Sequence, residues 1–164
     1  MKTTIVIYGS STGSCQSIAE TIASKLGVEA VDVTSINDDT VNNHENLILG
    51  TSTWGAGEMQ DDWYDGVKLL KGLDLTGKTV ALFGCGDSES YCDTFCGGMD
   101  ELYSALQDKG VKFVGAVSTD GYNFDDSAAV VDGKFVGLAL DDVNEDDKTD
   151  DRIDAWVEEI KAEL

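Results

Sequence analysis

The chain has 164 residues, with 32 acidic against 11 basic side chains and a formal net charge of −21. This length suits one domain over residues 1–164 with a core large enough to fold alone. The acidic excess excludes nucleic acid as a partner, because its binders carry basic patches, and it disfavours an anionic membrane surface. No run approaches the roughly 18 apolar residues of a membrane span, and no leader pattern opens the chain, so we expect a soluble, cytoplasmic protein.

The first predicted element is an apolar strand, Ile5 to Tyr8, that passes through a hydroxyl-rich loop at residues 9–14 into a helix over residues 15–26. Backbone N–H groups and the positive end of the helix dipole converge at this loop, which suits an anion. No basic residue occurs between Lys2 and Lys25, so the Lys-containing NTP-binding loop is excluded, and the G-x-G-x-x-G dinucleotide fingerprint is also missing. An ordinary strand-to-helix turn with Ser and Thr caps is the alternative interpretation.

Apolar runs of strand length alternate with helical periodicity along the rest of the chain, which predicts an α/β domain with a parallel sheet. Further strands are expected at residues 28–33, 46–51, 79–84 and 111–117. Helices are expected at residues 60–71, 95–109 and 150–163, with Gly27 and Gly110 as helix stops and Thr149 as an N-cap.

Residues 118–141 do not fit this alternation. We interpret them as an insertion that interrupts or doubles the fifth strand, with a hairpin at Asp132-Gly133. The acidic run that follows, residues 141–151, is expected to be a solvated loop.

The four cysteines do not form a recognisable framework. Cys15, Cys85, Cys92 and Cys96 are too few and too unevenly spaced for a disulfide scaffold. An iron–sulfur cluster is the alternative, but the spacing matches no ferredoxin pattern. They are interpreted as small loop and core residues.

Three strand ends carry unusual residues, and ligands of open parallel sheets bind outside the carboxyl ends of the strands. The first is the anion loop. The second is Thr51-Ser52-Thr53-Trp54-Gly55-Ala56-Gly57-Glu58, and the third is Gly84-Cys85-Gly86-Asp87-Ser88-Glu89-Ser90-Tyr91. Aromatic faces stack on a flat conjugated ring and keep water from it. The combination predicts a ligand with a phosphate tail and a flat ring, whereas either aromatic alone is more simply a packing residue.

These motifs together resemble the flavodoxin family of the long-chain type, over essentially the whole chain. Asp93-Thr94-Phe95 and Phe135-Val136-Gly137-Leu138-Ala139-Leu140-Asp141 add to the resemblance. It implies a flavodoxin-like, three-layer, doubly wound sheet of five parallel strands in the order 2-1-3-4-5 and one FMN bound non-covalently. The residues that it implies for FMN are Ser10, Ser11, Thr12, Gly13, Ser14 and Cys15 at the phosphate, Trp54 and Tyr91 beside the ring, and Thr53, Gly55, Ala56, Gly57, Cys85, Gly86, Asp87, Thr94 and Cys96 around its polar edge.

The chain departs from the family pattern at three positions. Cys15 stands where the phosphate loop generally ends in Thr, and Ser52 replaces a frequent Pro. Gly55 stands where long-chain members often have Asn. The family's peptide after the aromatic turns its carbonyl toward the flavin on one-electron reduction, and Gly makes that turn at the least steric cost. The hypothesis is a comparatively well stabilised neutral semiquinone.

The chain has no evident catalytic or metal-ligand constellation, and His44 lies in a polar stretch. The resemblance implies an electron-transfer protein rather than an enzyme, with the flavin supplying the chemistry at low potential. The expected partners are basic-surfaced redox enzymes, both reductases and oxidoreductases. They are expected to dock transiently on a monomer through an acidic rim, defined as Glu58, Asp61, Asp62 and Asp65.

Two rival functions remain open at this point. A phospho-acceptor receiver shares the sheet order, but it needs an acidic pair after strand one and an Asp after strand three, where this chain has Gly9-Ser10 and Thr51-Ser52-Thr53. A flavin-dependent quinone reductase would bind NAD(P)H, and no second nucleotide site is visible. Steady NADH oxidation by the pure protein would favour the reductase.

Overall fold

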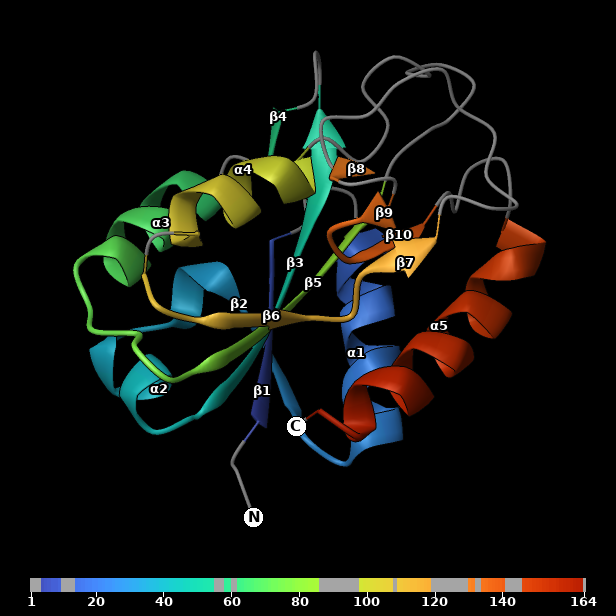
Figure 1. Ribbon diagram of the computed structural model, residues 1–164, viewed down its shortest axis with the longest axis horizontal. Coiled ribbons are helices and arrows are strands. Elements are labelled where there is room, and N and C mark those ends of the chain that lie inside the picture. Colours follow the sequence, from blue (N-terminus) through green and yellow to red (C-terminus); the bar gives the residue numbers. More distant parts are fainter. Residues whose placement is uncertain are drawn as a thin grey trace.

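A parallel sheet lies between two layers of helices (Figure 1). The computed structural model describes residues 4–9, 14–54, 58–59, 62–85, 98–107, 109–118, 130–131, 134–140 and 146–163. Among these residues, no helix combines the length and the apolar character that crossing a bilayer requires.

The main sheet has the strand order β2-β1-β3-β5, and two short strands, β6 and β10, both pair with β5. Its members are β1 (Thr4–Gly9), β2 (Glu29–Asp32), β3 (Asn46–Trp54), β5 (Thr79–Cys85), β6 (Lys112–Val114) and β10 (Leu138–Leu140), with β4 (Glu58–Met59) added to β3. Every pairing is parallel except that of β3 with β4. The predicted order 2-1-3-4-5 is therefore confirmed.

The fifth position of the sheet is divided between two strands. β6 pairs with Thr79–Ala81 at the start of β5, and β10 pairs with Phe83–Cys85 at its end. The interruption therefore falls between Val114 and Leu138, earlier than the expected residues 118–141.

The expected strand over residues 111–117 is wrong at its end, and Gly115 gives the physical reason. Its φ is +83°, a left-handed conformation, and an added Cβ would lie 2.6 Å from Nε1 of Trp156. The chain leaves the sheet here, and Trp156 Nε1 donates a hydrogen bond to the Gly115 carbonyl at 2.8 Å.

A small antiparallel sheet lies within the interruption. It consists of β7 (Val117–Ser118), β8 (Val130–Val131) and β9 (Lys134–Phe135), in the order β7-β9-β8. β8 and β9 pair on either side of residues 132–133, which agrees with the hairpin expected there, although the two turn residues lie outside the described part.

Two hydrophobic clusters fill the space on the two faces of the sheet. On one face lie η1 (Val33–Ser35), α2 (Asp38–Asn42), α3 (Asp62–Lys71) and α4 (Gly98–Leu106). On the other lie α1 (Ser14–Leu26) and α5 (Asp146–Lys161). Strand residues alternate accordingly: Ile5 and Ile7 belong to the first cluster and Val6 and Tyr8 to the second.

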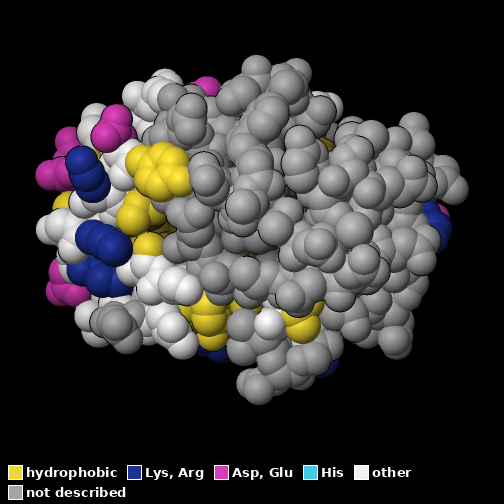
Figure 2. Space-filling model, turned by 90° about the horizontal axis from the view of Figure 1, so that it is seen from above, with side chains coloured by type: hydrophobic (Ala, Val, Ile, Leu, Met, Phe, Trp, Pro, Cys, Tyr) yellow, Lys and Arg dark blue, Asp and Glu magenta, His cyan; other side chains and the backbone are white. Residues whose placement is uncertain are grey.

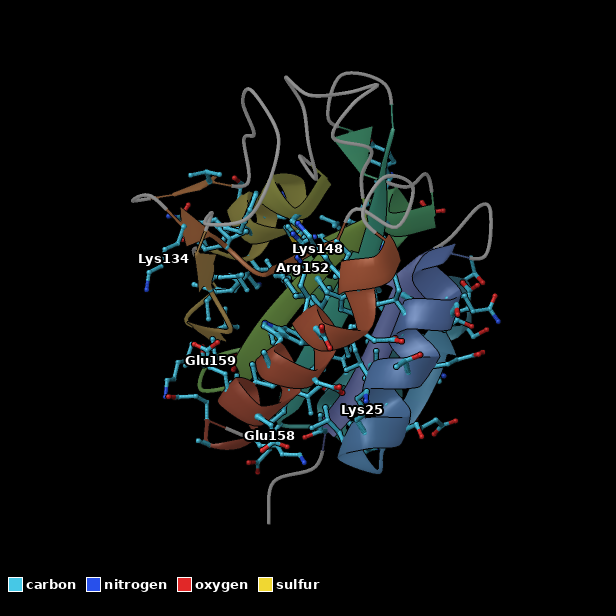
Figure 3. The ribbon with its side chains drawn as sticks, turned by 90° about the vertical axis from the view of Figure 1, so that its right-hand side faces the viewer. Lys25, Lys134, Lys148, Arg152, Glu158 and Glu159 are labelled. Carbon is cyan, nitrogen blue, oxygen red and sulfur yellow. The ribbon has the colours of Figure 1, made fainter. Side chains whose placement is uncertain are left out.

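α1 and α5 lie side by side, and an ion pair joins Lys25 of α1 to Asp154 of α5 (Figure 3). Hydrogen bonding to Asp154 raises the pKa of Lys25 above its ordinary value. Because both side chains are substantially exposed, this pair contributes little to stability. The apolar side chains Ile153, Trp156 and Ile160 therefore dominate the attachment of α5.

Helix ends agree with the sequence in part. Gly27 has a φ of +70° and directly follows α1, as a helix stop requires. The helix expected over residues 95–109 is wrong at its end, because α4 ends at Leu106 and Gly110, with a φ of +74°, lies in a turn beyond it. The predicted start of the last helix is wrong, because α5 begins at Asp146 and Thr149 is buried inside it. Half of the expected acidic loop is therefore helical, and acidic residues at a helix N-terminus are favoured by its dipole.

Two short helices were not predicted from the sequence. Asn37 caps α2, and its side chain and that of Thr40 form a reciprocal capping box. Asp32 caps η1 by accepting from the Thr34 N–H. Both capping patterns are present in the sequence, but segments this short have no apolar periodicity.

Candidate functional site

The carboxyl ends of three strands meet at one edge of the sheet. The pairing places Gly9 of β1, Thr51 of β3 and Gly84 of β5 in a single row. β1 ends at this row and β5 one residue later, at Cys85. The three segments predicted to hold the ligand therefore all start from the same edge, which is the upper one in Figure 1.

The N-terminus of α1 adjoins the end of β1. The helix begins at Ser14, and its first residues, Ser14 to Ser17, include no acid. No basic residue precedes Lys25 in the helix either. At the positive end of the helix dipole, the groups available to bind an anion are therefore backbone N–H groups, and such donors fit a phosphate.

β3 extends further than its predicted end at Thr51. It continues to Trp54 and returns as β4, with Thr53 opposite Met59 and Trp54 opposite Glu58. Residues 55–57, between the paired positions, lie outside the described part of the chain. The predicted Trp-bearing loop is therefore flanked by paired strands, with Trp54 in β3 and Glu58 in β4.

Side chains pack closely beneath this edge. An added Cβ at Gly50 would overlap the ring of Phe83, and one at Gly84 would lie 2.6 Å from Cγ of Met99. Phe83 and Met99 are both fully buried. The floor of the candidate site consists of backbone held by large side chains on both faces, a rigid base for a binding site.

The indole of Trp63 joins α3 to this floor. Its Nε1 donates to the carbonyl of Gly50 at 2.6 Å, and both groups are buried. The sequence identified Trp63 only as an apolar helix position. The sequence signal that could have identified this contact is a Trp in the first turn of a helix that follows a strand with a buried glycine.

The structure describes the backbone of five predicted site residues, and all five lie at the carboxyl edge: Ser14, Cys15, Thr53, Trp54 and Cys85. The other predicted residues lie outside the described part of the chain: Ser10, Ser11, Thr12, Gly13, Gly55, Ala56, Gly57, Gly86, Asp87, Tyr91, Thr94 and Cys96. The role of each side chain toward a ligand thus stays a prediction. No group of metal-ligating side chains occurs among the described residues.

Figure 2 looks down onto this edge. The described side chains on its left flank, over α3 and α4, include acidic, basic and hydrophobic groups. Tyr64 of α3 is 42% exposed, and Asp65 and Lys68 beside it are also exposed. The flank described here is therefore of mixed charge, and the predicted acidic rim is represented on it by Asp65.

A doubly wound parallel sheet of this order, with a helix N-terminus and two further strand ends at the point where strand order reverses, defines the flavodoxin-like class of fold. A family model described as Flavodoxin matches residues 6–156. The chain belongs to the flavodoxin family.

Individual relatives resemble the chain over nearly its full length. A Nostoc flavodoxin is 44% identical, over 97% of this chain and 95% of its own. Flavodoxin 1 of Azotobacter vinelandii is 41% identical over the same shares. The crystal structure of Fusobacterium nucleatum flavodoxin bound to flavin mononucleotide is 38% identical, has a TM-score of 0.93 and covers 100% of this chain and 99% of that one.

Proposed function

We propose that residues 1–164 form one domain that binds one FMN non-covalently and carries single electrons between redox enzymes at low potential. The observation that carries the proposal is the alignment of Gly9, Thr51 and Gly84 at one edge, beside the N-terminus of α1. The flavodoxin of F. nucleatum, whose structure contains FMN, shares this fold at a TM-score of 0.93. Flavodoxins are themselves a standard example of ligand binding at the carboxyl edge of a doubly wound sheet.

Each group of predicted residues binds a different part of FMN. Residues 10–15 and the N-terminus of α1 hold the phosphate through hydroxyls and backbone N–H groups. Trp54 and Tyr91 flank the ring and keep water from it. The backbone around residues 53–57 and 85–96 meets the polar edge of the ring. When bound, FMN supplies one-electron redox chemistry.

The charge of the protein acts on the second reduction. Full reduction adds negative charge beside a chain whose net charge is −21. This is unfavourable and lowers the second potential, by about 59 mV for each 1.4 kcal/mol. Stepwise reduction of the FMN-loaded protein tests the carrier role: we expect two resolved one-electron potentials. A single two-electron step with steady NADH oxidation would indicate a reductase instead.

Substitution of Gly55 by Asn should bring the two one-electron potentials closer together. The peptide after Trp54 turns most easily at glycine, so a side chain at position 55 raises the cost of stabilising the one-electron state. A cost of about 1 kcal/mol corresponds to roughly 40 mV in the first potential. Spectroelectrochemical titration measures both values, and unchanged potentials in Gly55→Asn would show the idea to be wrong.

Several lysines lie at the edge of the sheet opposite the candidate site. Because the helices run antiparallel to the strands, their C-terminal turns lie at the edge opposite the candidate site, where α5 ends in Figure 1. Lysines occupy several of these positions: Lys25, Lys71 and Lys161 in the last turns of α1, α3 and α5, and Lys112 at the start of β6. Three of these lysines pair with acids of the same edge, Lys25 with Asp154, Lys112 with Glu163 and Lys161 with Glu158. Docking of a basic partner on a cytoplasmic monomer is therefore proposed from the acidic rim itself and from the net charge of −21.

Electron exchange with a basic reductase should slow as salt is added, by about tenfold between roughly 0.05 and 0.5 M ionic strength, because steering between opposite charges is screened. Asp65→Lys should lower the rate at low salt by several fold. Glu29→Lys is the matched control, because Glu29 is exposed at the start of β2, on the opposite edge. Equal effects of both variants, or a rate independent of salt, would contradict docking at this rim. Stopped-flow kinetics measures each rate.

A further inference from the structure

We propose that Trp63 is a positioning residue for the flavin site, a role that rests on the proposed function. Its indole N–H binds at the base of the β3–β4 pair, which carries the predicted site residues Thr53 and Trp54. The hydrogen bond from Trp63 Nε1 to the Gly50 carbonyl, 2.6 Å long and buried, joins two residues 13 positions apart in the sequence. The chain between them includes the end of β3 and the antiparallel strand β4.

The hairpin needs such a closure because it projects beyond the sheet. β1 supports β3 as far as Thr51, and β5 supports it as far as Ser52. Beyond these residues, Thr53 and Trp54 pair with β4. The direction in which this pair leaves the sheet is therefore set by α4, which contacts β4, and by the base of the pair, where Gly50 and Trp63 meet.

Packing fixes the indole in the orientation that makes this bond. Gly50 has no room for a side chain, because Phe83 fills the space where a Cβ would lie. On α3, the Trp63 ring lies beside Gly66, whose added Cβ would stand 3.0 Å from Cε3. Trp63 is fully buried. A phenyl ring could fill much of this volume, but it has no N–H to give to the Gly50 carbonyl.

A second tryptophan provides a matched control. Trp156 also donates its indole N–H to a glycine carbonyl, that of Gly115, at 2.8 Å. Gly115 follows β6, which pairs with the amino-terminal half of β5, away from the candidate site. Trp63→Phe and Trp156→Phe thus remove the same kind of bond from two places, and only the first should affect the flavin.

The test compares both variants with the unmodified protein in FMN titrations and potential measurements. We expect both to unfold at a lower temperature, because each leaves a glycine carbonyl with one donor fewer, buried at Gly50 and partly buried at Gly115. Trp63→Phe should weaken FMN binding by about tenfold and shift the one-electron potentials, whereas Trp156→Phe should change neither. Unchanged FMN affinity and potentials in Trp63→Phe, or equal changes in both variants, would overturn the positioning role.

If Trp63→Phe fails to fold, a measurement on the unmodified protein tests the positioning role of Trp63. If the Trp63 hydrogen bond strengthens FMN binding by a given factor, linkage requires that FMN binding stabilise this hydrogen bond by the same factor. Hydrogen exchange of the Trp63 indole N–H, followed by NMR, should therefore slow by about tenfold on FMN binding, and that of Trp156 much less. Equal protection of both indoles would overturn the role. Failure of the unmodified protein to bind any FMN would instead overturn the proposed function, and the positioning role with it.

Discussion

Gly50→Ala should destabilise the protein by about 3 kcal/mol, at the upper end of the usual cost of overpacking. The added methyl group would overlap the ring of Phe83, and Phe83 is fully buried. Phe83 has little freedom to move aside, because its ring makes an edge contact with Trp156 at a centroid distance of 6.4 Å. Urea unfolding measures the loss, and the midpoint of thermal unfolding should fall by about 9 °C.

The control and the rescue for this prediction come from the same chain. An added Cβ at Gly72, which is exposed, would have its nearest neighbour at 3.5 Å, so Gly72→Ala should change stability by less than about 0.5 kcal/mol. Phe83→Leu in the Gly50→Ala background should recover part of the loss, because the two residues compete for one space. Strict additivity of the two substitutions would show that the overlap is not the cause.

Trp54→Ala should weaken FMN binding by about 30-fold or more, equivalent to roughly 2 kcal/mol, because an aromatic face that covers the ring is lost. Tyr64→Ala is the control. Tyr64 is an aromatic residue of α3 that is 42% exposed and lies outside the predicted site. Titration with FMN, followed by the quenching of flavin fluorescence, measures both constants. Equal losses in the two variants, or no loss in Trp54→Ala, would remove Trp54 from the site.

The layer architecture could be predicted because its determinants are local. The runs at Ile5–Tyr8, 46–51 and 79–84 are apolar enough to be buried on both faces, and parallel order follows from their alternation with helices. The stop of α1 at Gly27 follows from that one residue. These features need no knowledge of which strands become neighbours.

The errors arose where distant residues decide the local structure. β3 continues past Thr51 because β4 returns beside it, and the fifth strand breaks at Gly115 because Trp156 of α5 binds there. α5 begins at Asp146, in a charged stretch without apolar periodicity, and Thr149 is buried within it. Tertiary contact overrode local pattern in each case.

In the candidate site, too, local features could be predicted from the sequence and long-range contacts could not. Its composition, an uncharged anion loop followed by Gly-rich strand ends with aromatics, is visible in the sequence. The bond between Trp63 and Gly50 is not, because it joins residues that come together only when α3 packs on β3. Motifs thus predicted which segments surround the ligand, and packing shows what holds one of them in place.

The most direct measurement of the central claim is a titration of the purified, flavin-free protein with FMN, monitored by visible absorption and calorimetry. We predict saturable binding of one FMN per chain, with affinity for riboflavin weaker by about tenfold or more, because the N-terminus of α1 then has no phosphate to bind. Failure to bind FMN, or equal affinity for FMN and riboflavin, would contradict a phosphate-anchored flavin at the carboxyl edge of this sheet.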